Sequence, residues 1–179
     1  MVPTRGELDE LVRQAQAGDR AAFAQIVAKL SPLLIRFFAL QGQDPERAEE
    51  SLQETFVRVY TKLQRYGARS DFRTWVLGIA RNVHREAGRA RRYAEVQPSD
   101  ASSEGSALDH LATQERREEL RAALARLPER MREVLHLRFV ERLSCAEIAE
   151  LIEASPQAVS PLIYRAKKAL REELERGSS

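Results

Sequence analysis

The chain has 179 residues, with 29 Lys and Arg against 27 Asp and Glu, a formal net charge of +2, and a hydrophobic share of 43%. This length and composition predict one or two small domains with apolar cores. Cys145 is the only cysteine, which excludes a disulfide within the chain and a cysteine-rich zinc site, and the three scattered histidines do not supply a metal site in its place. No apolar run approaches the roughly 20 residues of a membrane span, and the N-terminus lacks a signal-peptide core. We therefore expect a protein of the reducing cytoplasm, with no metal and no cofactor.

The N-terminal part of the chain has the apolar periodicity of helices. In chain order, the first three are expected over 5–17, 20–40 and 45–65. We expect a kink or break at Pro32, because proline lacks the backbone donor and crowds the preceding turn. Asp44 and Pro45 are typical of an N-cap and a first helical residue. The third helix has one side of acids and glutamine, which by itself indicates a solvated surface: Glu46, Glu49, Glu50, Gln53 and Glu54.

A fourth helix is expected over 72–92, capped by Ser70 or Asp71. Its apolar residues recur at intervals of four, three and four, as on one helix face: Phe72, Val76, Ile79 and Val83. Its arginines recur on another face: Arg73, Arg81, Arg85 and Arg89. Segment 69–92 carries seven arginines against two acids. A basic helix side suits the phosphates of a nucleic acid, and a plain solvated face is the alternative.

Residues 94–109 contain four acids, four serines and no Lys or Arg. Such a segment cannot bury enough apolar surface to offset the entropy of ordering it, so we expect a flexible acidic linker between a domain over 7–93 and a second domain over 110–175. The helices of the second domain are expected over 110–126, 129–140, 145–152 and 156–175. The predicted fold class is all-α, with two small helical domains.

The stretch 144–170 has the pattern of a helix-turn-helix. Ser144 and Glu147 have the spacing of a capping box, and Ser155 and Pro156 are typical of an N-cap and a first helical residue. Two short helices joined by a tight turn suit docking of the second helix in the major groove of DNA. On this pattern alone, a plain helical hairpin is the alternative.

Several stretches, in this order, resemble the extracytoplasmic-function (ECF) family of bacterial sigma factors. They are "LVRQAQAGDRAAFAQIV" (11–27), "AEESLQETFVRVYTKL" (48–63), "FRTWVLGIARN" (72–82), "LPERMREVLHLRFVERLS" (127–144), "EIAELI" (147–152) and "RAKKAL" (165–170). The resemblance covers nearly the whole chain outside the linker. It implies sigma region 2 over 7–93 and sigma region 4 over 110–175, in a protein that binds core RNA polymerase, directs it to promoters and helps to melt them, without itself catalysing a reaction. Promoter DNA and an anti-sigma factor or other regulator are the other partners it implies.

The resemblance also implies roles for particular residues. Core polymerase, through its β′ clamp helices, would be bound by Glu50, Gln53 and Glu54, and region 4 would meet the β flap. The −10 element would be bound by Arg73, Trp75, Arg81, Asn82, Arg85 and Arg89. For Phe72, a place in the core explains the residue at least as well as a DNA contact. The linker is either a passive tether or a segment that threads the active-site cleft of polymerase.

The last expected helix departs from the family pattern. Glu153 stands where the family has glycine, and Ser160, Pro161 and Leu162 stand where it has Lys, Ser and Arg. Pro161, the sixth helical residue, is expected to bend or delay the helix, at a cost of about 3 kcal/mol. Contacts to −35 DNA would then be left to Gln157, Ser160, Arg165, Lys167 and Lys168. Two hypotheses follow for region 4: it reads −35 DNA weakly, or it binds a regulator rather than DNA.

Overall fold

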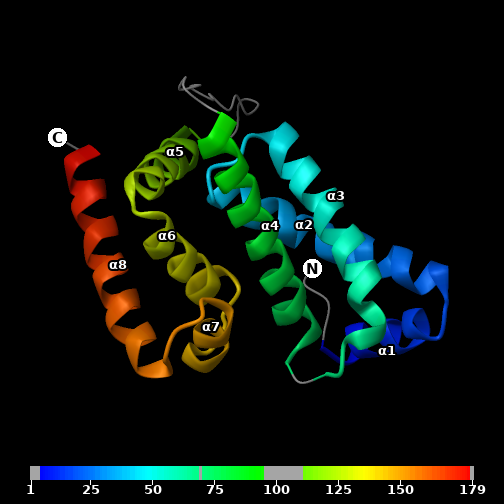
Figure 1. Ribbon diagram of the computed structural model, residues 1–179. Coiled ribbons are helices and arrows are strands. Elements are labelled where there is room, and N and C mark those ends of the chain that lie inside the picture. The colour runs from blue at the N-terminus through cyan, green and yellow to red at the C-terminus, as the bar shows by residue number, and fades with distance from the viewer. Residues whose placement is uncertain (1–4, 69, 95–110, 178–179) are drawn as a thin grey trace. The chain divides into compact units, whose positions relative to one another are not determined.

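The computed structural model describes residues 5–68, 70–94 and 111–177, and the regular elements within these ranges are all helical (Figure 1). They fall into two compact units, α1 to α4 and α5 to α8. The predicted all-α class is confirmed. The expected linker, apart from Ala94 at the end of α4, lies outside the described residues.

The first unit consists of four helices and one short turn. They are α1 (Arg5–Gln16), α2 (Arg20–Leu40), α3 (Pro45–Lys62), the 3-10 turn η1 (Leu63–Arg65) and α4 (Phe72–Ala94). Helix α3 packs along α4, and α1 contacts both η1 and α4. The core is aromatic and aliphatic, with Phe38, Leu34, Val59, Phe72 and Val76 at most 1% exposed. This apolar layer fixes the directions in which α3 and α4 present their polar sides.

Helix α2 runs through Pro32 without a break, so of the kink or break expected there, the break does not occur. The proline ring is on the exposed side of the helix, and the preceding Ser31 hydroxyl donates to the Val27 carbonyl over 2.7 Å. Leu30 and Leu34, which flank the proline on the buried side, have no exposed surface. Each buried leucine contributes roughly 1.5–3 kcal/mol, which together offsets the cost of about 3 kcal/mol of a proline inside a helix.

By length and composition alone, α2 is apolar enough to cross a membrane, which the sequence analysis did not expect. The same test is passed by a core helix of a water-soluble protein. Lys29 and Arg36 lie along α2, and the Lys29 Nζ is 2.7 Å from Glu7 Oε1 of α1. Ile26 and Phe37 of the same helix are buried in the first unit. Its apolar character is thus accounted for by the core.

The caps predicted for the first unit are present. The Asp44 side chain accepts a hydrogen bond from the Arg47 backbone N–H over 2.9 Å, and Pro45 begins α3. Of the two candidates at the start of α4, Asp71 is the cap, because its Oδ1 accepts from the Arg73 backbone N–H over 2.9 Å. Each such cap contributes about 1 kcal/mol, so local sequence determines where α3 and α4 begin.

The second unit is built on its last helix. Its elements are α5 (Leu111–Arg126), α6 (Glu129–Leu135), the π-helical turn η2 (His136–Val140), α7 (Cys145–Leu151) and α8 (Pro156–Gly177). Helix α8 contacts α5, α6 and α7 (Figure 1). Val134, Ile148, Val159 and Ala166 have no exposed surface and form the centre of this unit.

The helix expected over 129–140 changes its winding at His136. The Glu141 backbone N–H donates to the His136 carbonyl, five residues earlier, over 3.1 Å, which is the hydrogen bond of a π turn. The His136 Nε2 lies 3.3 Å from Glu141 Oε1, and both side chains are only 1% exposed. A buried polar pair of this kind requires close packing around it, and the spacing of apolar residues does not predict such a pair.

Candidate polymerase and nucleic-acid interfaces

The polar side of α3 is exposed along its length. The three residues predicted to contact polymerase, Glu50, Gln53 and Glu54, are all exposed. Glu54 is also engaged within the unit, because Arg58 Nε donates to its Oε1 over 2.6 Å. The Nη2 atom of Arg58 is also 2.7 Å from Glu86 Oε2 on α4. The hydrogen bond to Arg58 lowers the pKa of Glu86, and the two carboxylates raise the pKa of Arg58.

The same side of α3 continues into an apolar area that the sequence analysis missed. Val57 is 60% exposed and Tyr60 is 55% exposed. The Tyr60 ring meets the Phe23 ring of α2 edge to face, with centroids 4.9 Å apart, and a shallow groove runs between the two helices. Val57 and Tyr60 stand four and seven residues after Gln53, so helical spacing could have placed them on its face. A surface of acids next to exposed apolar groups is typical of a protein-binding face.

Three aromatic side chains meet where α4 begins. Trp75 lies with its ring centroid 5.0 Å from that of Tyr66 and 5.5 Å from that of Phe72, and Tyr66 and Phe72 are 5.1 Å apart. Phe72 is 1% exposed and Trp75 is half-buried. Phe72 is therefore a core residue, and Trp75 lies at the edge of the core. Together they form the aromatic cluster Tyr66–Phe72–Trp75.

The loop that leads into this cluster is held at both ends. Gln16 of α1 donates through Nε2 to the carbonyls of Leu63 and Tyr66, over 2.9 and 3.0 Å. The Tyr66 hydroxyl donates to the Ser70 carbonyl over 2.7 Å. Between these contacts, Ala68 has a φ of 52°, a left-handed conformation that costs a residue with a Cβ roughly 1–2 kcal/mol. Strain held by surrounding contacts is common at functional loops.

The arginines of α4 do not form one exposed row. An α-helix turns by about 100° per residue, so Arg73 and Arg89 point in directions roughly 160° apart. Arg89 is exposed, Arg73 and Arg85 are half-buried, and Arg81 is only 7% exposed. The sequence led us to expect Arg81 on an open side of the helix, and its low exposure contradicts this expectation. Thr74, seven residues earlier on the same side of the helix, is buried as well, so α4 has a second buried side.

The turn between α7 and α8 has the expected helix-turn-helix form. The capping box predicted at Ser144 and Glu147 is present. Glu153 has a φ of 53°, and the backbone N–H groups of Glu153 and Ala154 donate to the carbonyls of Glu150 and Ala149. This is the Schellman arrangement, in which the left-handed residue is usually glycine.

Helix α8 begins at Pro156 and continues through Pro161, so the expected delay of the helix was wrong. Val159 and Ala166, fully buried on either side of Pro161, hold it to the unit. The residues predicted to face −35 DNA are all exposed: Gln157, Ser160, Arg165, Lys167 and Lys168. Lys167 also lies over the Phe139 ring, with its Nζ 5.7 Å from the centroid. Sequence reasoning missed Tyr164, which is 71% exposed among these residues.

Two family models match the two units. The Sigma-70 region 2 family matches residues 26–93, and the Sigma-70, region 4 family matches residues 117–170. The RNA polymerase sigma-H factor of Pseudomonas aeruginosa is 30% identical, over 96% of each chain. The ECF RNA polymerase sigma factor SigD of Mycobacterium tuberculosis is 33% identical, over 93% of this chain and 84% of that protein.

Solved structures show the same likeness. A chain in the structure of CnrH in complex with the cytosolic domain of CnrY matches with a TM-score of 0.69 and 26% identity, over 93% of this chain and 96% of that chain. The sigma factor RpoE from Bartonella quintana, in complex with the anti-sigma factor NepR, shares the fold with a TM-score of 0.70 and 22% identity, over 86% of this chain and 96% of that chain.

These matches define the protein as a sigma factor of the σ70 class, with regions 2 and 4. More narrowly, the chain belongs to the extracytoplasmic-function (ECF) family. It is an alternative sigma factor, which binds core RNA polymerase, directs it to specific promoters and assists promoter melting.

Proposed function

We propose that the first unit binds core polymerase through α3 and the −10 element through α4. The observation that carries this assignment is the opposite charge of two neighbouring helices in one unit. Exposed acids line α3, and exposed or half-buried arginines follow α4. Surfaces of opposite sign attract different partners, so one small unit can join a basic protein surface, the β′ clamp helices, to the phosphates of DNA.

On α3, Glu50 and Gln53 form the centre of the proposed polymerase contact. Glu54 contributes less, because its carboxylate is already bonded to Arg58. The exposed side chains of Val57 and Tyr60 extend the contact with apolar area. Apolar groups supply most of the affinity at such interfaces, and charges supply orientation and association rate.

On α4, we assign phosphate contacts to Arg85, Arg89 and the nearby Asn82, with Arg73 and Trp75 at the end where the strands separate. A base that leaves the duplex needs a flat apolar surface in place of its lost stacking, and the aromatic cluster supplies one. The 7% exposure of Arg81 supports a positioning role for that residue within α4, in place of the direct contact expected from the family.

For the second unit, we propose that the exposed face of α8 contacts −35 DNA through Gln157, Ser160, Arg165 and Lys168, with Lys167 held partly by Phe139. The alternative is that this unit binds a regulator rather than DNA. The observation in its favour is the exposed apolar surface of Leu120, Phe139 and Val140, which also suits the β flap. Since the sigma factor RpoE from Bartonella quintana was solved in complex with an anti-sigma factor, and CnrH with the cytosolic domain of CnrY, we include an anti-sigma factor among the proposed partners. In these roles the protein acts in the cytoplasm and catalyses no reaction itself.

The polymerase contact is tested by Glu50→Lys, measured as the affinity of the full chain for core polymerase. Reversing a charge at a complementary interface should weaken binding about tenfold or more. Asp9→Lys on α1 is the matched control, with the same charge change at an exposed helical position of the same unit. Equal affinities for Glu50→Lys and the control would remove the assignment of α3.

A further inference from the structure

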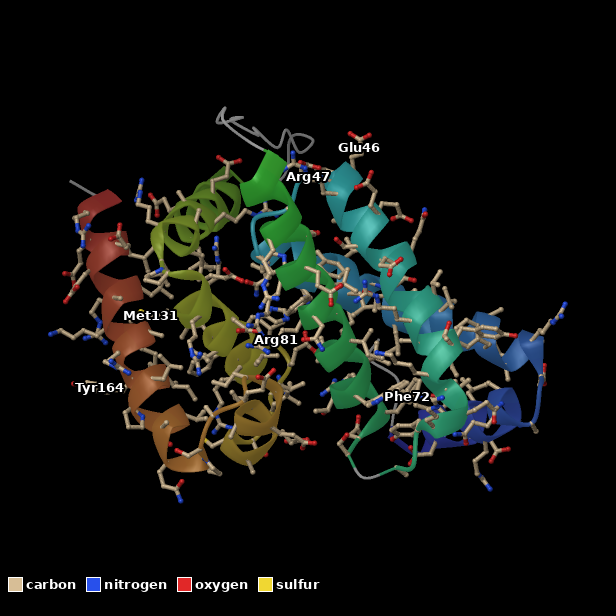
Figure 2. The ribbon with its side chains drawn as sticks, viewed as in Figure 1. Glu46, Arg47, Phe72, Arg81, Met131 and Tyr164 are labelled. Atoms are coloured by element: carbon tan, nitrogen blue, oxygen red, sulfur yellow. The ribbon has the colours of Figure 1, made fainter. Side chains whose placement is uncertain are left out.

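An exposed apolar pair lies within the polar face of α8. Tyr164 is 71% exposed, and Figure 2 shows it on the outer side of α8, away from α7. Pro161, also exposed, stands three residues earlier, which is the spacing of neighbours on a helix surface. Gln157 and Lys168, seven residues before and four after Tyr164, share this face. The face therefore has an apolar centre between polar ends.

The charge around the pair is of one sign. Between Pro156 and Arg171 the chain has four basic residues and no acidic residue. Arg165 and Lys168 are exposed beside the pair, while Lys167 lies against the Phe139 ring. An isolated exposed tyrosine on a protein surface needs no explanation. An apolar pair flanked by cations, on the second helix of a helix-turn-helix, matches a duplex whose phosphates flank its base edges.

We propose that Pro161 and Tyr164 read a thymine in the −35 element through its 5-methyl group. This inference rests on the proposed docking of α8 in the major groove. There, thymine presents a methyl group and one acceptor, whereas guanine presents two acceptors and cytosine one donor. The proline ring and the tyrosine ring can cover a methyl group but cannot satisfy the two acceptors of guanine. The Tyr164 hydroxyl can donate to the thymine O4 or to a phosphate.

The departure of this helix from the family pattern then changes the base that is read. Where the family has Lys, Ser and Arg, this chain has Ser160, Pro161 and Leu162. A lysine in the groove bonds well to guanine, and its replacement by Ser160 removes that preference. Leu162 is half-buried, so it stabilises the unit and does not face the groove. Arg165 and Lys168 remain to contact phosphates, which position the helix without reading sequence.

The test uses holoenzyme assembled from the full chain and core polymerase. The probe is a promoter duplex selected by that holoenzyme from a pool with a randomised −35 region, with each thymine there replaced in turn by deoxyuridine. Uracil differs from thymine only by the missing methyl group. At one position the replacement should weaken binding about fourfold, the effect of removing one methyl group from an apolar contact.

Variants then assign the methyl contact. Tyr164→Ala should bind the thymine and uracil duplexes equally, and Tyr164→Phe should keep the difference. Lys168→Ala, on the same face, should weaken both duplexes alike. Because Tyr164 is exposed, these variants should unfold at the temperature of the wild-type protein.

The outcomes separate this inference from the proposed function. A selected −35 sequence to which wild-type holoenzyme binds equally with thymine or uracil would overturn the methyl contact and leave α8 as a DNA-binding helix. Selection that returns no preference in the −35 region would overturn both the contact and the assignment of α8 to DNA. Loss of binding to another protein on Tyr164→Ala would then identify that face as a regulator site.

Discussion

The two helices proposed to bind DNA, α4 and α8, present their aromatic residues in opposite ways. At the start of α4, Phe72 is buried and Trp75 is packed between Phe72 and Tyr66. On α8, Tyr164 is 71% exposed. Most of the aromatic surface at the start of α4 is covered by contacts within the cluster, whereas that of Tyr164 on α8 is open to solvent. The first unit is thus suited to DNA that changes conformation, and the second to an intact duplex.

The stability of the two units also rests on different contacts. Phenylalanines such as Phe37, Phe38 and Phe72 fill the core of the first unit. The second unit buries the polar pair of His136 and Glu141 and leaves Phe139 55% exposed. A dense apolar core can hold a strained loop next to it, whereas exposed apolar groups are available to partners. The variants below test whether the first unit depends on its buried rings for stability and on its exposed residues for binding.

The largest effect is expected for Phe72→Ala. Truncating this buried ring should lower the free energy of unfolding of the first unit by about 3–5 kcal/mol. The measurement is denaturant unfolding followed by the fluorescence of Trp75, the only tryptophan in the chain, which reports on the first unit alone. Trp75→Ala, followed by circular dichroism, should cost clearly less stability but reduce promoter opening. If both variants lost the same stability with promoter opening unchanged, the cluster would be purely structural.

A smaller effect is expected from the cations of α4. The double variant Arg85→Ala with Arg89→Ala should flatten the dependence of open-complex formation on salt by about two units of slope, because each phosphate contact contributes roughly 0.9. Binding of core polymerase should be unchanged. The contrast is Arg81→Ala, which should destabilise the first unit and leave the slope as it is. A slope that falls only in Arg81→Ala would reverse our assignment.

Local sequence was sufficient for the helices and their ends. Apolar spacing and caps such as Asp44 and Ser144 act within a few residues, so they could be identified without the fold. The continuity of α2 at Pro32 could not be identified in this way, because the contacts that outweigh the proline come from other helices. The same is true of the π turn at His136, whose buried pair requires packing that no periodicity encodes.

For the candidate sites too, local sequence predicted which residues are exposed but not how they pack against other helices. The exposed residues of α3 and α8 follow from helical spacing. The burial of Arg81 and the bridge from Arg58 to Glu86 are results of tertiary packing, which the spacing of residues along one helix does not predict. Tyr164 was missed for a different reason. The family pattern directed attention to cations, and an aromatic residue on the same face fell outside it.

The third prediction concerns Glu153, the left-handed residue in the turn before α8. Glycine has no Cβ to strain at a φ of 53°, so Glu153→Gly should stabilise the second unit by about 1 kcal/mol relative to Glu153→Ala. The alanine variant is the control, because it removes the carboxylate and keeps the Cβ. The measurement is thermal unfolding by circular dichroism, in the transition that Trp75 fluorescence does not follow. Equal stability of the two variants would show that the turn is unstrained.

The smallest effect tests the bridge between α3 and α4. Arg58 holds the pKa of Glu86 below its ordinary value of 4.5, so the bridge stabilises the first unit above that pH and its contribution is lost as pH falls through the lowered pKa. The pair is partly exposed, so Arg58→Gln should cost less than about 1 kcal/mol at pH 7. We expect the difference in unfolding free energy between wild type and variant, followed by Trp75 fluorescence, to shrink below pH 4.5. Arg58→Lys, which keeps the positive charge, should retain part of the stabilisation that the bridge provides. If the difference in unfolding free energy stayed constant with pH, the aliphatic stem of Arg58 would stabilise the unit by packing. The ion pair between α3 and α4 would then contribute nothing to stability.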